Sequence, residues 1–164
     1  MNYRKAFIST CHYGWHKGFY NDGDYSSALG HIKYTDFFDD PYTEEFPYDS
    51  AEVLLCGSCN IFAFCLQKCL GYNAYVIEPN DKNGCHMFCQ IYKNRTWYYI
   101  DARGITTSFD EFMEVAKKFV SDEFTIRRLT DDDIEEWENE CDYNKEAYAF
   151  AEAIIEKYKD CYTL

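Results

Sequence analysis

Three residues of the types used in nucleophilic catalysis follow one another closely in this chain: Cys59, His86 and Asp101. In such a set a thiolate attacks a carbonyl carbon, a histidine transfers the proton, and a carboxylate orients the imidazole. Cys59 begins an apolar run, 60–66, that predicts a helix. A helix N-terminus stabilises a thiolate through its dipole and its unpaired backbone N–H groups. Cys59 is therefore the best candidate nucleophile, with His86 as acid and base and Asp101 as orienting carboxylate.

A helix and a hairpin are predicted to position these side chains. Ser58 can cap a helix that ends at Gly71 in a left-handed conformation. The segment 73–78 is predicted as a strand, and the runs 85–92 and 96–101 as the two strands of a hairpin. The candidate base therefore lies near the start of the hairpin, and the candidate carboxylate lies at its end.

The length of the hairpin loop decides whether His86 and Asp101 face each other. If Lys93-Asn94 is a two-residue loop, Tyr92 pairs with Arg95, and the same register places His86 directly opposite Asp101. Directly opposed Cβ atoms lie about 4.5–5.5 Å apart, close enough for the carboxylate to accept the imidazole N–H. A loop of three or four residues would shift this register.

The two-residue loop also predicts which side chains share a face with the candidate pair. We expect this face to pack beside the Cys59 helix, because the proposed chemistry needs the thiol there. Its side chains are Phe88, Gln90 and Tyr92 on the first strand and Arg95, Trp97 and Tyr99 on the second.

The C-terminal sequence predicts three further helices and a strand. Ser108 and Glu111 fit a capping box, after which apolar residues recur at helical spacing. The segment 123–129 is predicted as a strand, and Thr130 as the cap of a short acidic helix. The final helix carries an apolar stripe of Ala147, Phe150, Ala151, Ile154, Ile155 and Tyr158. Residues 1–50 show no sustained period and predict short elements and loops.

The whole chain is predicted to form one domain, 1–164. Its 164 residues, 47% of them hydrophobic, suffice to bury roughly two-thirds of the unfolded surface. The catalytic motifs fall within 56–104, and the acidic helical part within 108–160. The predicted fold class is α+β, with the nucleophile helix packed on a small antiparallel sheet and additional C-terminal helices.

The chain contains nine cysteines, so disulfide formation and metal binding are alternatives to a catalytic role for Cys59. The number is odd and the N-terminus lacks a signal peptide's apolar stretch, so reduced thiols are favoured. Four candidate zinc ligands lie close in sequence: Cys56, Cys59, Cys85 and His86. Adjacent strand residues point to opposite faces, so Cys85 and His86 would reach one ion only through a kink. Cys11-His12 and His16 form a thinner candidate, and we expect neither metal nor cofactor.

Each candidate residue also has a structural interpretation. Cys59 and His86 could be buried core residues, and Asp101 a turn residue at a strand end. Arg103 could bind a substrate carboxylate, but a surface ion pair is favoured, so Arg103 is left out of the catalytic set. Cys56 could be a resolving thiol, but a packed side chain is favoured, and this also holds for Cys65, Cys69 and Cys89.

The formal net charge of −13 opposes direct binding to nucleic acid phosphates or to anionic lipid. Residues 108–160 hold 17 acids against 7 Lys or Arg, which gives −10 of that charge. A solvated acidic face is the favoured interpretation, and a docking surface for a basic protein or a nucleic acid mimic is the alternative. We expect this part to lie outside the reaction centre. No apolar run of 18 residues occurs, so a cytoplasmic protein is expected.

The segment Cys56-Gly57-Ser58-Cys59, with Ala63-Phe64 after it, resembles the nucleophile region of papain-like proteases. That family places its His and Asn about 130–150 residues after the cysteine. Only 105 residues follow Cys59 here, and Val53 stands where such enzymes carry a glutamine. A papain-type enzyme therefore does not fit the chain.

The order of a Cys at a helix start, a His opening a strand and an Asp ending the next strand resembles the transglutaminase-like cysteine hydrolase superfamily. Proteases, transglutaminases, peptide glycanases and arylamine acetyltransferases belong to it. The chain is also similar to small bacterial and phage proteins that pair a Cys-x-x-Phe-Ala helix with a Tyr-x-Asp-Ala-x-Gly strand end. The similarity covers 49 of 164 residues and rests on Cys59 with Phe62-Ala63, on His86-Met87-Phe88 and on Tyr98-Tyr99-Ile100-Asp101-Ala102-Arg103-Gly104.

The resemblance implies an acyl-transfer enzyme of protease, deamidase or transglutaminase type. In it Cys59, His86 and Asp101 form the triad, no cofactor takes part, and the substrate is a protein or peptide. The alternative is a non-catalytic acidic binding or inhibitor protein on the same fold, such as a phage-encoded interaction module.

Overall fold

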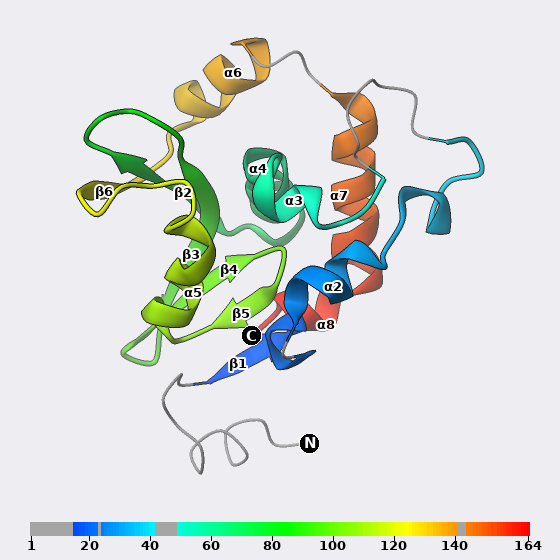
Figure 1. Cartoon of the computed structure of the whole chain (residues 1–164), viewed down its shortest axis with the longest axis horizontal. Coiled ribbons are helices and arrows are strands. Elements are labelled where there is room, and N and C mark those ends of the chain that lie inside the picture. The colour runs from blue at the N-terminus through cyan, green and yellow to red at the C-terminus, as the bar shows by residue number, and fades with distance from the viewer. Residues whose placement is uncertain (1–14, 23, 42–48, 141–143) are drawn as a thin grey trace.

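A computed structural model describes residues 15–22, 24–41, 49–140 and 144–164. A six-stranded antiparallel sheet with strand order β1-β5-β4-β3-β2-β6 forms the centre of this part of the chain (Figure 1). Its strands are β1 (His16–Gly18), β2 (Asn73–Pro79), β3 (His86–Lys93), β4 (Thr96–Asp101), β5 (Gly104–Thr106) and β6 (Phe124–Arg128).

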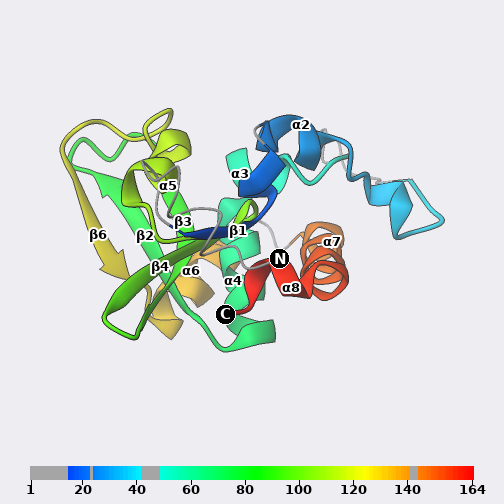
Figure 2. The same ribbon diagram turned by 90° about the horizontal axis from the view of Figure 1, so that it is seen from below.

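Helices cover both faces of the sheet, so the fold is mixed α and β, as predicted. Helix α4 lies between the sheet and α7, and α5 lies on the opposite face (Figures 1 and 2). The helices are α2 (Tyr25–Gly30), α3 (Val53–Cys56), α4 (Cys59–Leu70), α5 (Phe109–Ala116), α6 (Asp131–Glu140), α7 (Lys145–Lys157) and α8 (Lys159–Tyr162), with 3-10 helices η1 (Phe19–Asp22) and η2 (Tyr34–Asp36). None of the helices in the described ranges is long and apolar enough to cross a lipid bilayer.

Helix α4 begins and ends where the sequence predicts. Gly71 adopts the left-handed conformation with a φ of 71°, and its N–H donates to the carbonyl of Gln67 at 2.9 Å. Ser58 occupies the N-cap position, but its side chain makes no capping hydrogen bond. The N-terminus of α4 is thus left without a side-chain cap at the residue that precedes Cys59.

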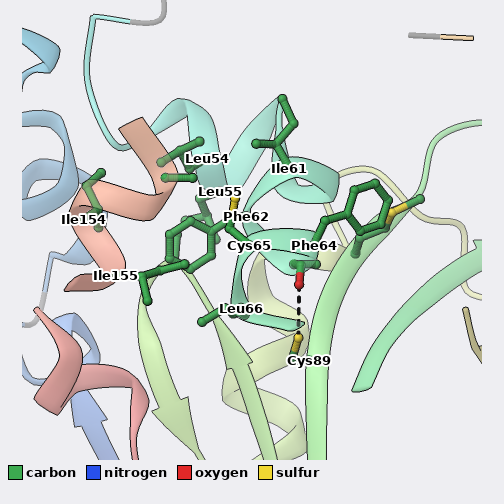
Figure 3. Packing of buried hydrophobic residues seen from close by; sticks show 14 of the residues in the cluster. Leu54, Leu55, Ile61, Phe62, Phe64, Cys65, Leu66, Cys89, Ile154 and Ile155 are labelled. Carbon is green, nitrogen blue, oxygen red and sulfur yellow. Dashed lines mark hydrogen bonds between the residues drawn. The ribbon is translucent and has the colours of Figure 1, made fainter. Parts of the chain in front are cut away.

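The largest hydrophobic cluster surrounds α4. Leucine, isoleucine and phenylalanine side chains of α3, α4 and α7 interdigitate there, and the Cys89 thiol donates to the Ala63 carbonyl at 3.4 Å (Figure 3). The predicted stripe of α7 is buried in this cluster, except that Tyr158 is only partly buried. Cys65 and Cys89 are the packed thiols that the sequence predicts.

The hairpin turn differs from the prediction. Asn94 and Arg95 occupy the turn, with φ values of 53° and 61°, and Lys93 pairs with Thr96. Two successive left-handed residues are typical of a hairpin turn whose twist matches that of the strands. The predicted loop of Lys93 and Asn94 was therefore wrong by one residue. This moves the partner of each β3 residue by two positions along β4. Because side chains alternate with a period of two, the shift keeps the residues of both strands on their predicted faces, although Arg95 now lies in the turn.

The face that carries Phe88 and Tyr99 packs against α5 and not beside α4. The ring of Phe112 lies 4.6 Å from Phe88 and 5.2 Å from Tyr99. The opposite face of β3, with Met87 and Cys89, packs against α4. Our expectation for this face was wrong because the apolar side of α5 covers it.

The C-terminal elements follow the predicted pattern closely. Ser108 caps α5 by accepting the Glu111 N–H at 3.2 Å, but the Glu111 carboxylate accepts the Thr106 hydroxyl at 2.7 Å and does not complete the box. Strand β6 lies within the predicted range, and Thr130 caps α6 by accepting the Asp133 N–H at 3.2 Å. Residues 15–50 form short elements, as expected, in the part that the structure describes.

Candidate active site

Cys59 is the first residue of α4 and is half-buried. Its sulfur accepts the backbone N–H of Met87 at 3.4 Å, which brings the helix start against the start of β3. The backbone N–H of Asn60, the next residue of α4, also helps to lower the pKa of this thiol. Two backbone donors and the N-terminus of α4 thus surround the thiol, an environment that favours the thiolate.

His86 opens β3, and its side chain is fully buried. Its Nε2 lies 3.5 Å from Oδ2 of Asp101, and its ring lies 5.8 Å from that of Phe112. The imidazole also interacts with the Cys59 thiol. Neither ring nitrogen makes a hydrogen bond of ordinary length and angle, so these contacts have the loose geometry common in resting enzymes.

Asp101 ends β4 and is also buried. The register places it diagonally across from His86 and not directly opposite, because Cys89 pairs with Ile100. Diagonal neighbours remain within reach of long side chains. The structure therefore brings the thiol, the imidazole and the carboxylate together, although the register predicted for the last two was wrong.

Arg103 is the residue that the sequence interpretation misplaced. Its guanidinium is fully buried and donates to Asp101 through Nη2 at 2.6 Å and through Nε at 3.1 Å. It lies over the rings of Tyr20 and Tyr25, at 4.6 Å and 5.1 Å from their centroids, and it donates to the carbonyl of Phe112 at 2.8 Å. The predicted surface ion pair is instead a buried ion pair.

The reason is the chain reversal between β4 and β5. The N–H of Arg103 donates to Oδ1 of Asp101 at 2.9 Å, which turns the guanidinium back toward the carboxylate. Tyr20 and Tyr25, about 80 residues earlier, then cover it. A signal was present in the tyrosine-rich segment before residue 26, but no period there indicated which side chains face inward.

Burial favours the neutral form of all three candidate residues, and their mutual contacts oppose it. Despite burial, the Arg103 guanidinium foremost, with His86, holds the pKa of Asp101 well below its usual range. Burial also opposes ionisation of His86, yet the contacts with Asp101 and then Cys59 raise the pKa of the imidazole to about 9. Against its own burial, the Cys59 thiol has a lowered pKa through its contact with the His86 imidazole and through the backbone N–H groups of Met87 and Asn60. The shifts together favour a thiolate–imidazolium pair.

A cavity of about 250 Å³ opens beside this pair. Cys59 and His86 line it, together with Phe119 from the chain after α5 and Trp137 from α6. We expected the acidic part 108–160 to lie outside the reaction centre, and this was wrong. The part supplies Phe119 and Trp137 to the cavity wall, and Phe112 packs on His86 because α5 covers the face of the sheet on which His86 lies.

The other cysteines near the site differ from one another. Cys56 lines the same cavity and is exposed, as is Cys69, so neither is the packed side chain that was favoured. Burial raises the pKa of the Cys56 thiol, the opposite of the shift at Cys59. Within the described ranges, no three His, Cys, Asp or Glu side chains are grouped so as to hold a metal ion. Cys11-His12 of the thinner metal candidate lie outside the described residues.

Comparisons of the chain with protein-family models, with curated proteins and with solved structures found no match. The geometry of Cys59, His86, Asp101 and Arg103 is therefore the basis on which a function can be proposed.

Proposed function

We propose that this protein is a thiol-dependent acyl-transfer enzyme, with Cys59 as nucleophile, His86 as acid and base and Asp101 as the orienting carboxylate. The observation that carries the proposal is the half-buried Cys59 thiol at the start of α4, which interacts with the buried His86 imidazole that the buried Asp101 carboxylate also contacts. The order of these residues on helix, strand and strand also supports a transglutaminase-like core.

The reaction would proceed in two halves. The Cys59 thiolate attacks the substrate carbonyl carbon, and a carbon–sulfur bond forms. The imidazolium of His86 gives its proton to the leaving amine, so the carbon–nitrogen bond breaks and a thioester remains. Water or a second amine, deprotonated by His86, then attacks the thioester and releases the thiolate. Asp101 keeps the imidazole oriented and stabilises its charged form throughout.

Catalysis also needs donors for the oxyanion that forms on the carbonyl oxygen. The backbone N–H of Cys59, at the start of α4, is the donor that this scheme uses. The absence of a Ser58 side-chain cap leaves the first turn of α4 open to such a role.

Alkylation with iodoacetamide at mildly acidic pH tests the first half of this scheme. Cys56 serves as an internal control, because it lines the same cavity but has a raised pKa. We expect mass spectrometry to show Cys59 modified at least about tenfold faster than Cys56, since the thiolate is the reactive form. Equal rates at the two thiols would leave the non-catalytic binding protein as the better interpretation.

Acyl transfer itself is tested with a p-nitrophenyl ester. We expect a burst of about one nitrophenolate per chain and a matching acyl mass on the peptide that contains Cys59. A Cys59→Ala variant should show neither, whereas a Cys56→Ala variant should show both. A fast-alkylating Cys59 that never carries an acyl group would contradict the proposed enzyme.

A further inference from the structure

A second cavity adjoins the one that contains Cys59. It has a volume of about 600 Å³ and extends to Pro79 and Thr125, where β2 pairs with β6. The two cavities share three lining residues, Gly84, Cys85 and Trp137. We call the two together the Trp137 cleft. It leads from the nucleophile toward the paired strands β2 and β6, and its size is that of a site for several residues of a ligand.

The walls of the cavity beside Cys59 combine apolar side chains and bare backbone with the polar side chains of Asn60 and His86. Leu55, Phe119 and Trp137 supply apolar side chains, and Gly57 and Gly84 supply none. Gly84 has a φ of 80°, and a Cβ there would lie 2.4 Å from the carbonyl oxygen of Phe119. This wall therefore stays free of a side chain, and the space beside the thiol suits an apolar group on an extended backbone.

The acidic helix α6 contributes Trp137 to both cavities, and it contains seven carboxylates and neither Lys nor Arg. Arg127 donates to Asp133 at 2.9 Å and to Glu78 at 3.1 Å, and Glu78 lines the larger cavity. The Asp133 side of α6 therefore faces the cleft. Helical spacing places the exposed Glu136 and Glu140 on that same side.

The larger cavity is lined by one cation, Lys82, and one carboxylate, Glu78, so the excess of carboxylates beside it comes from α6 rather than from the cavity lining. Carboxylates concentrated along one edge attract cationic ligands and repel anionic ones. A polyanionic acyl carrier, such as a coenzyme A thioester, is therefore disfavoured, and a basic polypeptide is favoured.

We infer that the Trp137 cleft binds a basic polypeptide segment, with an apolar side chain on the residue that presents the reacting carbonyl to Cys59. This inference rests on the proposed acyl-transfer function and names its substrate class. The apolar side chain lies between Leu55, Phe119 and Trp137, and the Lys or Arg residues of the substrate lie along the Glu136 and Glu140 side of α6.

Peptidyl vinyl sulfones test the inference, because they alkylate a nucleophilic thiol only after binding beside it. One probe carries Leu next to the vinyl sulfone and three Lys further out, a second replaces Lys with Glu, and a third replaces Leu with Gly. Each rate at Cys59 is divided by the iodoacetamide rate at the same thiol. We expect the Lys probe to react about tenfold faster than the Glu probe at low salt, with the difference shrinking as salt is added.

Two variants locate the binding groups. Glu136→Gln with Glu140→Gln should remove most of the preference for Lys over Glu, whereas the matched change Glu156→Gln with Asp160→Asn, on α7 and α8, should leave it intact. Trp137→Ala should remove the preference for Leu over Gly. Because Glu136 and Glu140 are exposed, their variant tests the inference even if Trp137→Ala fails to fold.

The outcomes separate this inference from the proposed function. Equal probe rates at a Cys59 that reacts rapidly with iodoacetamide would overturn the basic-substrate inference and leave acyl transfer standing. A preference for the Glu probe would overturn it too. Slow iodoacetamide labelling of Cys59 would instead overturn the proposed function on which the inference rests.

Discussion

The two faces of strand β3 have different surroundings, although their residues alternate along a single strand. Met87 and Cys89 face α4 and belong to the large apolar cluster. His86 and Phe88 face α5, where the buried Asp101 carboxylate also lies. The first face contributes hydrophobic burial to the fold, and the second supports charges that burial alone would neutralise. Changes to the first face should therefore affect stability alone, whereas changes to the second should also affect thiol chemistry.

The largest expected effect follows from His86→Ala on the charged face. Without the imidazole, burial raises the pKa of Cys59, and the thiolate fraction falls about tenfold for each unit of that rise. We expect the alkylation rate of Cys59 near pH 6 to fall by roughly a thousandfold. Thermal unfolding should show a folded protein, since Arg103 still pairs with Asp101. If Cys59 stays reactive in His86→Ala, the imidazole is not what holds Cys59 as a thiolate.

The ion pair of Asp101 and Arg103 gives the next effect. Both groups are buried, so removing either one leaves an uncompensated charge, at a cost of about 3–5 kcal/mol. We expect Asp101→Asn and Arg103→Met each to lower the free energy of unfolding by this amount. The double variant should lose clearly less than the sum of the two single losses. Additive losses in urea unfolding would mean that the two side chains do not depend on each other.

The comparable change in the apolar cluster beside the first face of β3 is Leu66→Ala in α4. Leu66 is fully buried two turns from Cys59 on α4, so its truncation should cost about 2–5 kcal/mol of unfolding free energy. The alkylation rate of Cys59 in the folded variant should stay within about twofold of the wild-type rate, because no charged group is touched. A large loss of thiol reactivity here would show that the two faces are not separable.

The smallest effect is a difference in pH dependence. The raised pKa of His86, about 9, stabilises the folded state fully below the ordinary value of 6.5, and this contribution is lost as the pH rises to 9. The lowered pKa of Cys59 acts in the opposite direction, because its contribution grows as the pH rises toward the ordinary thiol value of 9.0. The pair holds one proton in both states, so the two trends offset each other.

We therefore expect the unfolding free energy of the wild type to change little between about pH 6.5 and 8. Cys59→Ala keeps only the His86 trend and should lose roughly 1 kcal/mol over this range. Cys56→Ala is the control and should follow the wild type. Parallel curves for the wild type and Cys59→Ala in chemical denaturation would show that no thiolate–imidazolium pair forms.

Local signals in the sequence predicted most of the elements and the meeting of the three candidate residues. Gly71, Ser108 and Thr130 have the predicted roles, because caps and helix ends depend on a few neighbouring residues. The hairpin register could not be predicted, since it depended on whether Arg95 accepts a left-handed conformation. The alternation of side chains survived that error, and so His86 and Asp101 stayed on one face.

Long-range contacts account for what the sequence did not show. The burial of Arg103 depends on Tyr20 and Tyr25, and the cavity wall depends on Trp137, each from a segment distant in the chain. Such pairings leave no periodic signal in either segment. The acidic composition of α6 predicted a solvated face. It gave no indication that Trp137, the one aromatic residue of α6, lines the cavity.

The 3-10 helix η1, which follows β1, and helix α8, from the two ends of the described chain, both contact the backbone of the turn that carries the Asp101–Arg103 ion pair. The N–H of Tyr20 donates to the Arg103 carbonyl at 3.2 Å, and the Tyr162 hydroxyl donates to the Ala102 carbonyl at 3.1 Å. A transient opening of either segment would admit water to Arg103 and weaken its attraction for Asp101. The fraction of time in which the thiol is ionised is thus linked to fluctuations of segments far from Cys59 in the sequence.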